Sequence, residues 1–356
     1  MSVTIKDVAK AAGVSVASVS RAFNGHDNVT RDTCERIMQA AQQLHYMPNG
    51  AARSLITRRT QTIGALLPDL HGAFFSELIR GIDLAARAHG MHLLVSSSHD
   101  DADEAAAAMR AMLGRVDGLL VMSPHANPGF LSDNLPPVLP TVLMNTGSGD
   151  GRHPWLTVDN HGGAHAMTRH LMSGGYRRIA FICGPDNNVD AAERLRGYRD
   201  ALGELVDECA MYCQPGNFRE ASGYHAGRRL LAMSPRPEAV FAANDMMALG
   251  CLAAFNEAGL NIPGDIALAG FDDVPMARYT MPSLSTVRVR IAEFGECALT
   301  RLIDAIEHPD ETHAVEQVMP TELVTRTSCG VSAREESPRK AVAARDAPAV
   351  HPPTDG

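Results

Sequence analysis

The chain has 356 residues, of which 45% are hydrophobic and 5% aromatic, and its formal net charge is −9. This length and composition predict a globular protein of two or three domains with a sizeable core. The charge is uneven, because residues 1–60 hold eight Lys and Arg against four Asp and Glu, whereas the rest holds 24 against 37. The asymmetry predicts that residues 1–60 meet nucleic-acid phosphates and that the acidic remainder does not.

Several function classes are excluded by what the sequence does not contain. The seven cysteines are scattered without a CxxC pair, which predicts neither a disulfide framework nor a zinc site. No GxSxG motif, P-loop or nucleophile with a base occurs, so we expect no enzyme, no cofactor and no metal. A signal peptide and a long apolar run are also missing, so we expect a cytoplasmic protein with no membrane contact.

The first two dozen residues predict two short helices joined by a tight turn. Thr4 and Asp7 fit a capping box for the first helix, Gly13 ends it, and Ser15 fits the cap of the second. The second helix would turn three apolar side chains inward, namely Val19, Ala22 and Phe23. This pattern is a helix-turn-helix, whose second helix fits the DNA major groove.

A third helix should complete this N-terminal head, which we place at residues 1–47. Its predicted apolar stripe consists of Cys34, Ile37, Met38, Ala41 and Leu44. Residues 48–60 are small and basic and lack such a stripe, so we expect a hinge that becomes ordered on DNA. From Thr62 onward apolar runs alternate with amphipathic stretches in two successive series, which predicts two α/β lobes with parallel sheets. Residues 331–356 are rich in Pro, Ala and charge and should form a disordered tail.

Several segments, taken in order over residues 3–328, resemble the LacI/GalR family of bacterial transcription regulators. They are TIKDVAKAAGVSVASVSRAFNG from Thr4, RSL from Arg53, VDGLLVM from Val116, GPDNNVDAAERLRGY from Gly184, AVFAANDMMALG from Ala239 and GDIALAGFDDVPMARYTMPSLSTV from Gly264. The resemblance implies a periplasmic-binding-protein-like body over residues 61–330, with effector binding and dimerisation as its tasks. The implied N-lobe covers about 61–159 and 289–319, and the implied C-lobe covers about 160–288 and 320–330. The chain would cross between lobes near Asp159, Arg288 and Pro320, with the ligand in the cleft.

The candidate DNA contacts lie in the head and the hinge. Arg21 can donate two hydrogen bonds to guanine, and the resemblance places Val16 and Ala17 at the two specificity positions before it. Polar side chains suited to phosphate contacts are Thr4, Ser15, Ser18, Ser20 and Asn24, although capping alone would explain the first two. By resemblance, Leu55, beside Arg53, would enter the minor groove at the centre of a palindromic operator held by a homodimer; packing on the body is the alternative.

The candidate effector contacts lie where predicted elements of the two lobes end. Arg194, Asn244 and Asp272 match ligand positions of the family and can donate to and accept from vicinal hydroxyls. Phe74, Phe75 and Phe218 could stack on a ring, although packing in the core is nearly as good an explanation. The weaker candidates are Asp190, Asn188 and Asp159.

The predicted function is therefore a DNA-binding repressor controlled by a small sugar-like effector bound between two lobes. Asn188 and Asp190 stand where purine-sensing members of the family carry Arg and Thr, which favours a neutral saccharide over a purine. Two alternatives remain open: a purine-responsive regulator of the same family, and the solute-binding protein of a sugar transporter. The C-terminal tail lacks leucine heptads, which favours a homodimer over a tetramer.

Overall fold

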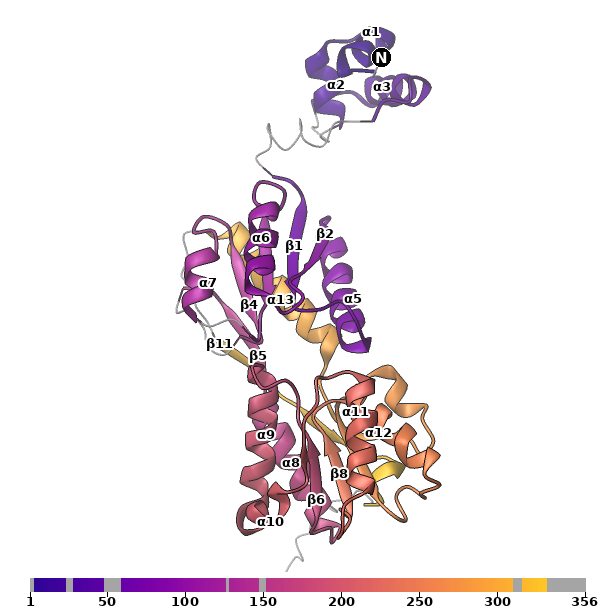
Figure 1. Ribbon diagram of the computed structural model, residues 1–356. Coiled ribbons are helices and arrows are strands. Elements are labelled where there is room, and N and C mark those ends of the chain that lie inside the picture. Colours follow the sequence, from indigo (N-terminus) through magenta and orange to yellow (C-terminus); the bar gives the residue numbers. More distant parts are fainter. Residues whose placement is uncertain are drawn as a thin grey trace, which may run out of the picture.

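The computed structural model describes residues 3–23, 28–47, 59–125, 128–146, 152–309 and 316–331 (Figure 1). Most of the expected hinge, residues 48–58, and most of the expected tail, residues 332–356, lie outside this set. The head contains α1 (Ile5–Ala12), α2 (Val16–Phe23) and α3 (Arg31–Gln43). They pack around Val8, Val19 and Ile37, each fully buried. The predicted three-helix head is confirmed.

The apolar stripe of α3 differs from the prediction at one position. Ile37, Ala40 and Ala41 are buried, whereas the side chain of Met38 is 42% exposed. With successive residues turned by about 100°, Ala40 and Ala41 lie on either side of Ile37 around the helix, and Met38 lies beyond Ala41 at the edge of this face. In a head of three short helices α3 is covered on one side, and Met38 falls beyond that side.

The N-lobe is built on a six-stranded parallel sheet. Its strand order is β11 (Glu316–Met319), β5 (Trp155–Val158), β4 (Thr141–Met144), β3 (Gly118–Met122), β1 (Thr62–Leu67) and β2 (His92–Ser97). β1, β3 and β4 are buried along nearly their whole length, as central parallel strands with both faces covered must be. Its helices are α5 (Ala73–Ala88), α6 (Ala102–Met112), α7 (Pro128–Asn134) and α13 (Ile291–Glu307).

The C-lobe repeats this plan with one antiparallel edge. Its strand order is β12 (Glu322–Val324), β10 (Ser285–Arg288), β9 (Ala267–Asp272), β8 (Ala239–Ala242), β6 (Ile179–Ile182) and β7 (Cys213–Gln214). β12 runs antiparallel to β10, and the other pairs are parallel. Its longer helices are α8 (Asn160–Ser173), α9 (Val189–Leu202), α11 (Glu220–Leu231) and α12 (Asp245–Glu257), with the short α10 (Val206–Ala210) after α9. The predicted pair of α/β lobes with parallel sheets is confirmed.

The chain passes repeatedly between the two sheets within the described residues. It goes from β5 of the N-lobe into α8 of the C-lobe, returns from β10 to α13, and leaves again from β11 to β12. The carboxyl ends of central strands from both lobes meet at one cavity, which is lined by residues one or two positions after the ends of β1, β4 and β8. Loops at the carboxyl ends of parallel strands are where such folds bind ligands. Among the described residues, no helix is long and apolar enough to span a membrane.

Candidate DNA-binding face and effector cleft

The turn between α1 and α2 is fixed by local hydrogen bonds. The Asp7 carboxylate accepts the amide of Thr4 at 2.9 Å and its hydroxyl at 2.7 Å. These two bonds lower the pKa of Asp7. Gly13 has the left-handed φ of 65° that ends α1, and the Ser15 hydroxyl accepts the amide of Ser18 at 3.1 Å. Both caps expected from the sequence are therefore present: Thr4 and Asp7 at the start of α1, and Ser15 at the start of α2.

One side of α2 is buried in the head and the other is open. Val19 and Ala22 are buried, and Phe23 is partly buried with its ring centroid 5.8 Å from that of Tyr46. The opposite side presents the side chains expected to meet DNA, with Val16, Ala17 and Arg21 exposed and Ser18 and Ser20 partly exposed. Thr4 and Ser15 are also exposed, at the amino ends of the two helices. The remaining candidates Asn24, Arg53 and Leu55 lie outside the described residues.

A cavity lies between the lobes at the carboxyl ends of the strands. Seven predicted effector contacts from five separate segments line it, namely Phe74, Phe75, Asp190, Arg194, Phe218, Asn244 and Asp272. An outer compartment shares some of this lining and adds charged groups, among them Asp69, Asp100, Arg219 and Glu220. Arg219 of the C-lobe and Asp69 of the N-lobe form an ion pair there, with 2.9 Å between nitrogen and oxygen. The structure thus brings the predicted side chains together in one inter-lobe cleft.

Arg194 is the central cation of the inner compartment. It projects from α9, is almost fully buried, and donates from Nε to Asn160 Oδ1 at 2.8 Å and from Nη1 to the carbonyl of Ala243 at 2.6 Å. Its guanidinium carbon lies 3.9 Å from the centre of the Phe271 ring, which is a cation–π contact. These contacts hold the guanidinium plane in one orientation, so its remaining donors have a defined direction.

Two carboxylates flank this guanidinium, that of Asp272 buried and that of Asp190 half-buried. Asp190 Oδ1 accepts from Asn160 Nδ2 at 2.9 Å, and Asp272 Oδ1 lies 3.2 Å from Arg194 Nη1. Burial raises the pKa of both Asp190 and Asp272 to about 6, because desolvation outweighs the opposing attraction of Arg194. Although it is close to Arg194, Asp272 Oδ1 is not aligned for a hydrogen bond and has no partner among the described residues.

Backbone strain marks the same compartment. Asp272 has a φ of 112° and Phe218 a φ of 64°, values that residues with a β-carbon adopt at a cost of on the order of 1–3 kcal/mol each. Asp272 ends β9, and its backbone carbonyl accepts the amide of Val289 at 3.2 Å. The surrounding structure over-determines these conformations, which aim the side chains into the cavity.

Two asparagines of the cleft make hydrogen bonds that stabilise the fold. Asn244 caps α12 by accepting the amide of Met247 at 3.0 Å, and its side-chain amide donates to the carbonyl of Phe218 at 3.0 Å. Asn188 caps α9 by accepting the amide of Ala191 at 3.0 Å. Asn244 therefore holds the Phe218 loop in place, and it keeps one amide hydrogen for a ligand.

Three residues of this region were not predicted from the sequence. Asn145 follows β4 and lines the cavity with a buried Oδ1 that has no partner among the described residues. Asn160 begins α8 and joins Arg194 to Asp190. Asp245 lies behind Asp272, bonded to the Thr286 hydroxyl at 2.6 Å, and burial raises its pKa well above the usual range. Each follows an apolar strand or precedes a helix, a placement that could have singled them out.

The weaker candidate Asp159 does not line the inner compartment. Its carboxylate accepts the amide of Gly162 at 2.8 Å and so caps α8, and it borders a separate hollow with Trp155 and Arg196. The structure thus gives Asp159 a role in starting the helix. Asn188 and Asp190, the other weaker candidates, do line the inner compartment.

A helix-turn-helix head followed by two α/β lobes around a polar cleft defines the class of ligand-responsive DNA-binding regulators. Residues 4–49 match the model of bacterial regulatory proteins of the lacI family, and residues 168–329 match a periplasmic binding protein-like domain.

Similar proteins extend the match over almost the whole chain. The HTH-type transcriptional regulator GalS of Salmonella typhimurium is 35% identical over 328 residues, covering 92% of this chain and 96% of that protein. The HTH-type transcriptional repressor PurR of Erwinia tasmaniensis is 36% identical over 334 residues, covering 91% and 96%. The solved structure of the lac repressor dimer bound to operator and the anti-inducer ONPF aligns with a TM-score of 0.81 at 26% identity, covering 92% and 99%.

The chain belongs to the LacI family of transcription regulators. It is thus a DNA-binding regulator and not an enzyme, and the family binds operator DNA and small effectors. The resemblance read from the sequence is confirmed. The head decides between a regulator and the solute-binding protein of a transporter in favour of the regulator.

Proposed function

We propose that this chain is a cytoplasmic transcriptional repressor whose operator affinity is controlled by a neutral saccharide bound between the lobes. The observation that carries the proposal is the set of open polar atoms in the inner compartment. Buried Asn145 Oδ1 has no hydrogen-bond partner among the described residues, Asp272 Oδ1 has an ion pair with Arg194 but no aligned hydrogen bond there, and Asp190 adds a second carboxylate. Buried acceptors without donors are costly, so the compartment suits a ligand with several hydroxyl groups.

The charge of the compartment supports a neutral ligand. Its lining holds the carboxylates of Asp190 and Asp272 against the single guanidinium of Arg194. A phosphorylated or acidic sugar would add a further negative charge to a buried site, where unpaired charge is expensive. The rings of Phe74, Phe75 and Phe218 supply apolar surface for the face of a sugar ring.

On the DNA side, we propose that residues 1–47 bind DNA and that residues 48–60 act as a hinge. Arg21 would contact guanine, Val16 and Ala17 would read the neighbouring bases, and phosphates would be held by Thr4, Ser15, Ser18, Ser20 and Asn24. Arg53 and Leu55 would enter the minor groove at the centre of a palindrome.

A homodimer completes the proposal. Large apolar side chains remain exposed on α5, on the edge strand β2 and in the segment after β9, namely Leu84, Leu94, Met276, Tyr279 and Met281. Apolar groups of this size at the surface mark a contact with another protein when they gather on one face. A second copy of residues 61–330 would cover them and hold two heads for the two halves of an operator.

Thermal denaturation with a ligand panel tests the effector class. A ligand present at about 100 times its Kd raises the unfolding free energy by about 2.7 kcal/mol, so a true effector raises the melting temperature. The panel contains hexoses, pentoses, disaccharides, sugar phosphates, and purine bases and nucleosides. We expect a neutral saccharide to stabilise the wild type and an Asp133→Asn control, but not Asp272→Asn. Stabilisation by a purine or a sugar phosphate alone would overturn the proposed effector class.

A further inference from the structure

Where the chain enters the N-lobe, the residues just before β1 are hydrogen-bonded to the carboxylate of Asp117. Asp117 immediately precedes β3, and its two oxygens accept three hydrogen bonds from the residues before β1. Oδ1 accepts the amide of Thr60 at 2.6 Å and its hydroxyl at 2.8 Å, and Oδ2 accepts the amide of Gln61 at 2.8 Å. Hydrogen bonds to a charged acceptor are roughly twice as strong as neutral ones, so this is a firm attachment.

The backbone bends sharply at the same point. Gln61 has a φ of 53°, in the left-handed region that residues with a β-carbon rarely adopt. Its carbonyl accepts the amide of His92 at 2.9 Å, and the amide of Asp117 donates to the carbonyl of Thr62 at 2.7 Å. A left-handed residue persists where its surroundings over-determine it, and here hydrogen bonds reach it from two neighbouring segments.

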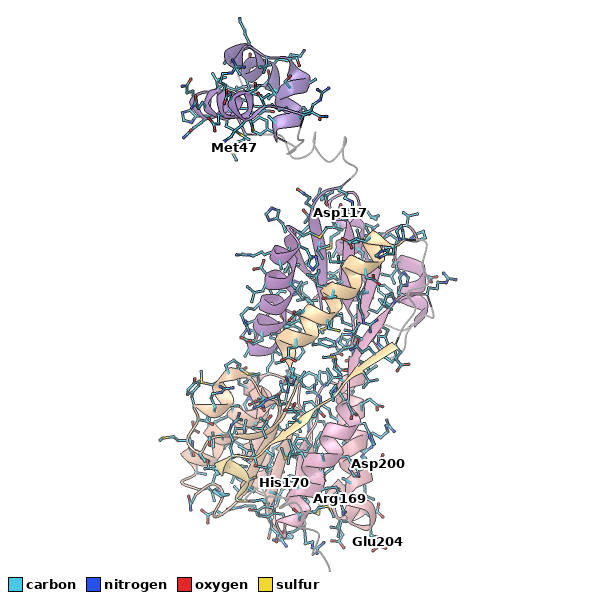
Figure 2. All side chains as sticks on the ribbon, turned by 180° about the vertical axis from the view of Figure 1, so that it is seen from behind. Met47, Asp117, Arg169, His170, Asp200 and Glu204 are labelled. Atoms are coloured by element: carbon cyan, nitrogen blue, oxygen red, sulfur yellow. The ribbon has the colours of Figure 1, made fainter. Side chains whose placement is uncertain are left out.

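The attachment and the effector cleft occupy opposite ends of the same two strands. β1 and β3 pair in parallel from Ile63 opposite Gly118 to Leu66 opposite Val121. Their carboxyl ends carry Pro68, Met122 and Pro124, which line the inner compartment. Figure 2 shows Asp117 at the end of the N-lobe farthest from the C-lobe. Because both strands are buried in the lobe core, the two ends move together.

We propose that Asp117 is a positioning residue for operator binding. By clamping Thr60 and Gln61 to the amino ends of β1 and β3, it fixes the direction in which the chain leaves the N-lobe toward the DNA-binding head. A reorientation of the N-lobe around a bound effector then reaches the head through this attachment. The inference rests on the proposed function, because it assigns a residue to the coupling between effector and operator.

The chemistry of the attachment selects the test variant. A carboxylate offers acceptors alone, which matches three donors, whereas the amide of Asn would set N–H groups against at least one of them. Asp117→Asn therefore keeps the size of the side chain and breaks part of the clamp. Thr60→Val is a graded variant, since it removes the hydroxyl bond and retains both backbone bonds. Asp133→Asn, at an exposed carboxylate in α7 of the same lobe, is the matched control.

Hydrogen exchange and DNA binding measured on the full chain decide the question. The probe is a DNA duplex selected in vitro by the wild-type protein, followed by fluorescence anisotropy. For Asp117→Asn we expect faster exchange at the amides of Thr60 and Gln61 and an affinity for the duplex lower by about tenfold, the scale of one charge-assisted hydrogen bond. Thr60→Val should lose less affinity, and Asp133→Asn none. The melting temperature of the body in Asp117→Asn should stay within a few degrees of the wild-type value. If Asp117 served only to stabilise the fold, the substitution would lower the melting temperature instead.

Two results would overturn the proposal. One is unchanged exchange at Thr60 and Gln61 in Asp117→Asn, which would mean that the carboxylate does not hold this segment. The other is a wild-type affinity of Asp117→Asn for the duplex, which would mean that the clamp does not position the head. A wild-type chain that selects no duplex would instead contradict the DNA-binding function, and the exchange measurement would still decide whether the clamp exists.

Discussion

At the scale of single residues, the cleft is unusual in holding more negative than positive groups away from water. Asp190 and Asp272 share one guanidinium, that of Arg194, and a third carboxylate, Asp245, lies behind them. The pKa values of Asp190 and Asp272 rise to about 6 through burial, so their ionised forms are disfavoured in the folded protein. A ligand with hydroxyl donors would stabilise the ionised forms of these carboxylates in the cleft.

The first prediction concerns stability against pH. The usual pKa of Asp is 3.8, and folding raises that of Asp190 and Asp272 to about 6, so between these values the folded state binds more protons than the unfolded state. Their contribution is complete below about pH 4 and is lost as the pH rises through 6. Asp272→Asn and Asp190→Asn cannot ionise, so at pH 7.5 each should melt above the wild type by on the order of 2–4 °C.

Thermal melting at steps between pH 4.5 and 7.5 measures this difference. The gap between each variant and the wild type should shrink toward zero near pH 5, where the wild-type carboxylates are protonated as well. Asp133→Asn removes an exposed carboxylate and should show no such trend. A gap that does not change with pH would contradict the assigned burial of the ionised groups.

A second prediction concerns the contribution of Arg194 to the stability of the fold. Replacing Arg194 by Met leaves Asn160, the Ala243 carbonyl and two buried carboxylates without their cation. Breaking one side of a buried ion pair costs about 3–5 kcal/mol, so chemical denaturation at pH 7.5 should show a loss of that size. The loss should be smaller at pH 5, where Asp190 and Asp272 take up protons. If Arg194→Met kept wild-type stability at both pH values, the guanidinium would not be holding these groups.

At the scale of elements, the packing of α5 against α13 depends on a glycine. A β-carbon added at Gly81 would lie 2.1 Å from the carbonyl oxygen of Ala292 in α13, which is backbone and cannot rotate away. Gly81→Ala should force the helices apart and lower the unfolding free energy by about 1–3 kcal/mol, as overpacked cores do. Urea denaturation measures the loss, and Ser76→Ala on the exposed side of α5 is the control. Equal stability of Gly81→Ala and wild type would contradict the close approach.

Elements stabilised by near neighbours in the sequence were predictable, and those that depend on distant segments were not. The caps at Asp7 and Ser15 arise within three residues, so spacing alone revealed them. The strands of the sheet centres read as continuous apolar runs. By contrast, β12 pairs antiparallel with β10 through residues 34 to 38 positions apart, and Met38 is exposed because the other two helices of the head do not cover its side of α3.

The cleft was partly predictable for the same reason. Asn244 and Asp272 stand at the ends of elements, where ligand-binding side chains of parallel sheets gather, whereas Arg194 reaches the cleft from inside α9. Which of these side chains stabilise the fold and which remain open to a ligand was not predictable. The hydrogen bond from Asn244 to the Phe218 carbonyl, and the bridge from Arg194 through Asn160 to Asp190, depend on contacts between segments more than twenty residues apart.

At the scale of the whole molecule, the basic head and the acidic body have separate functions. The surplus of basic residues within 1–60 attracts DNA, whereas the acidic remainder is repelled by it, so the head alone should approach the phosphates. In the proposed function an effector acts on DNA binding through a change in geometry, since the two proposed sites share no residue. Such coupling is reciprocal, and operator DNA must alter the effector affinity by the same factor.

The last prediction concerns the assembly that this coupling needs. Met281 and Tyr279 are 88% and 73% exposed, and a single copy of the chain gives these side chains no apolar partner comparable to a core. If a second copy covers them, Met281→Asp together with Tyr279→Asp should bury a carboxylate in the interface and shift the protein from dimer to monomer. Analytical ultracentrifugation measures the shift, with Val138→Asp, at a side chain 90% exposed before β4, as the control. A dimer that survives the double substitution would place the interface elsewhere, and a monomeric wild type would remove the dimer from the mechanism.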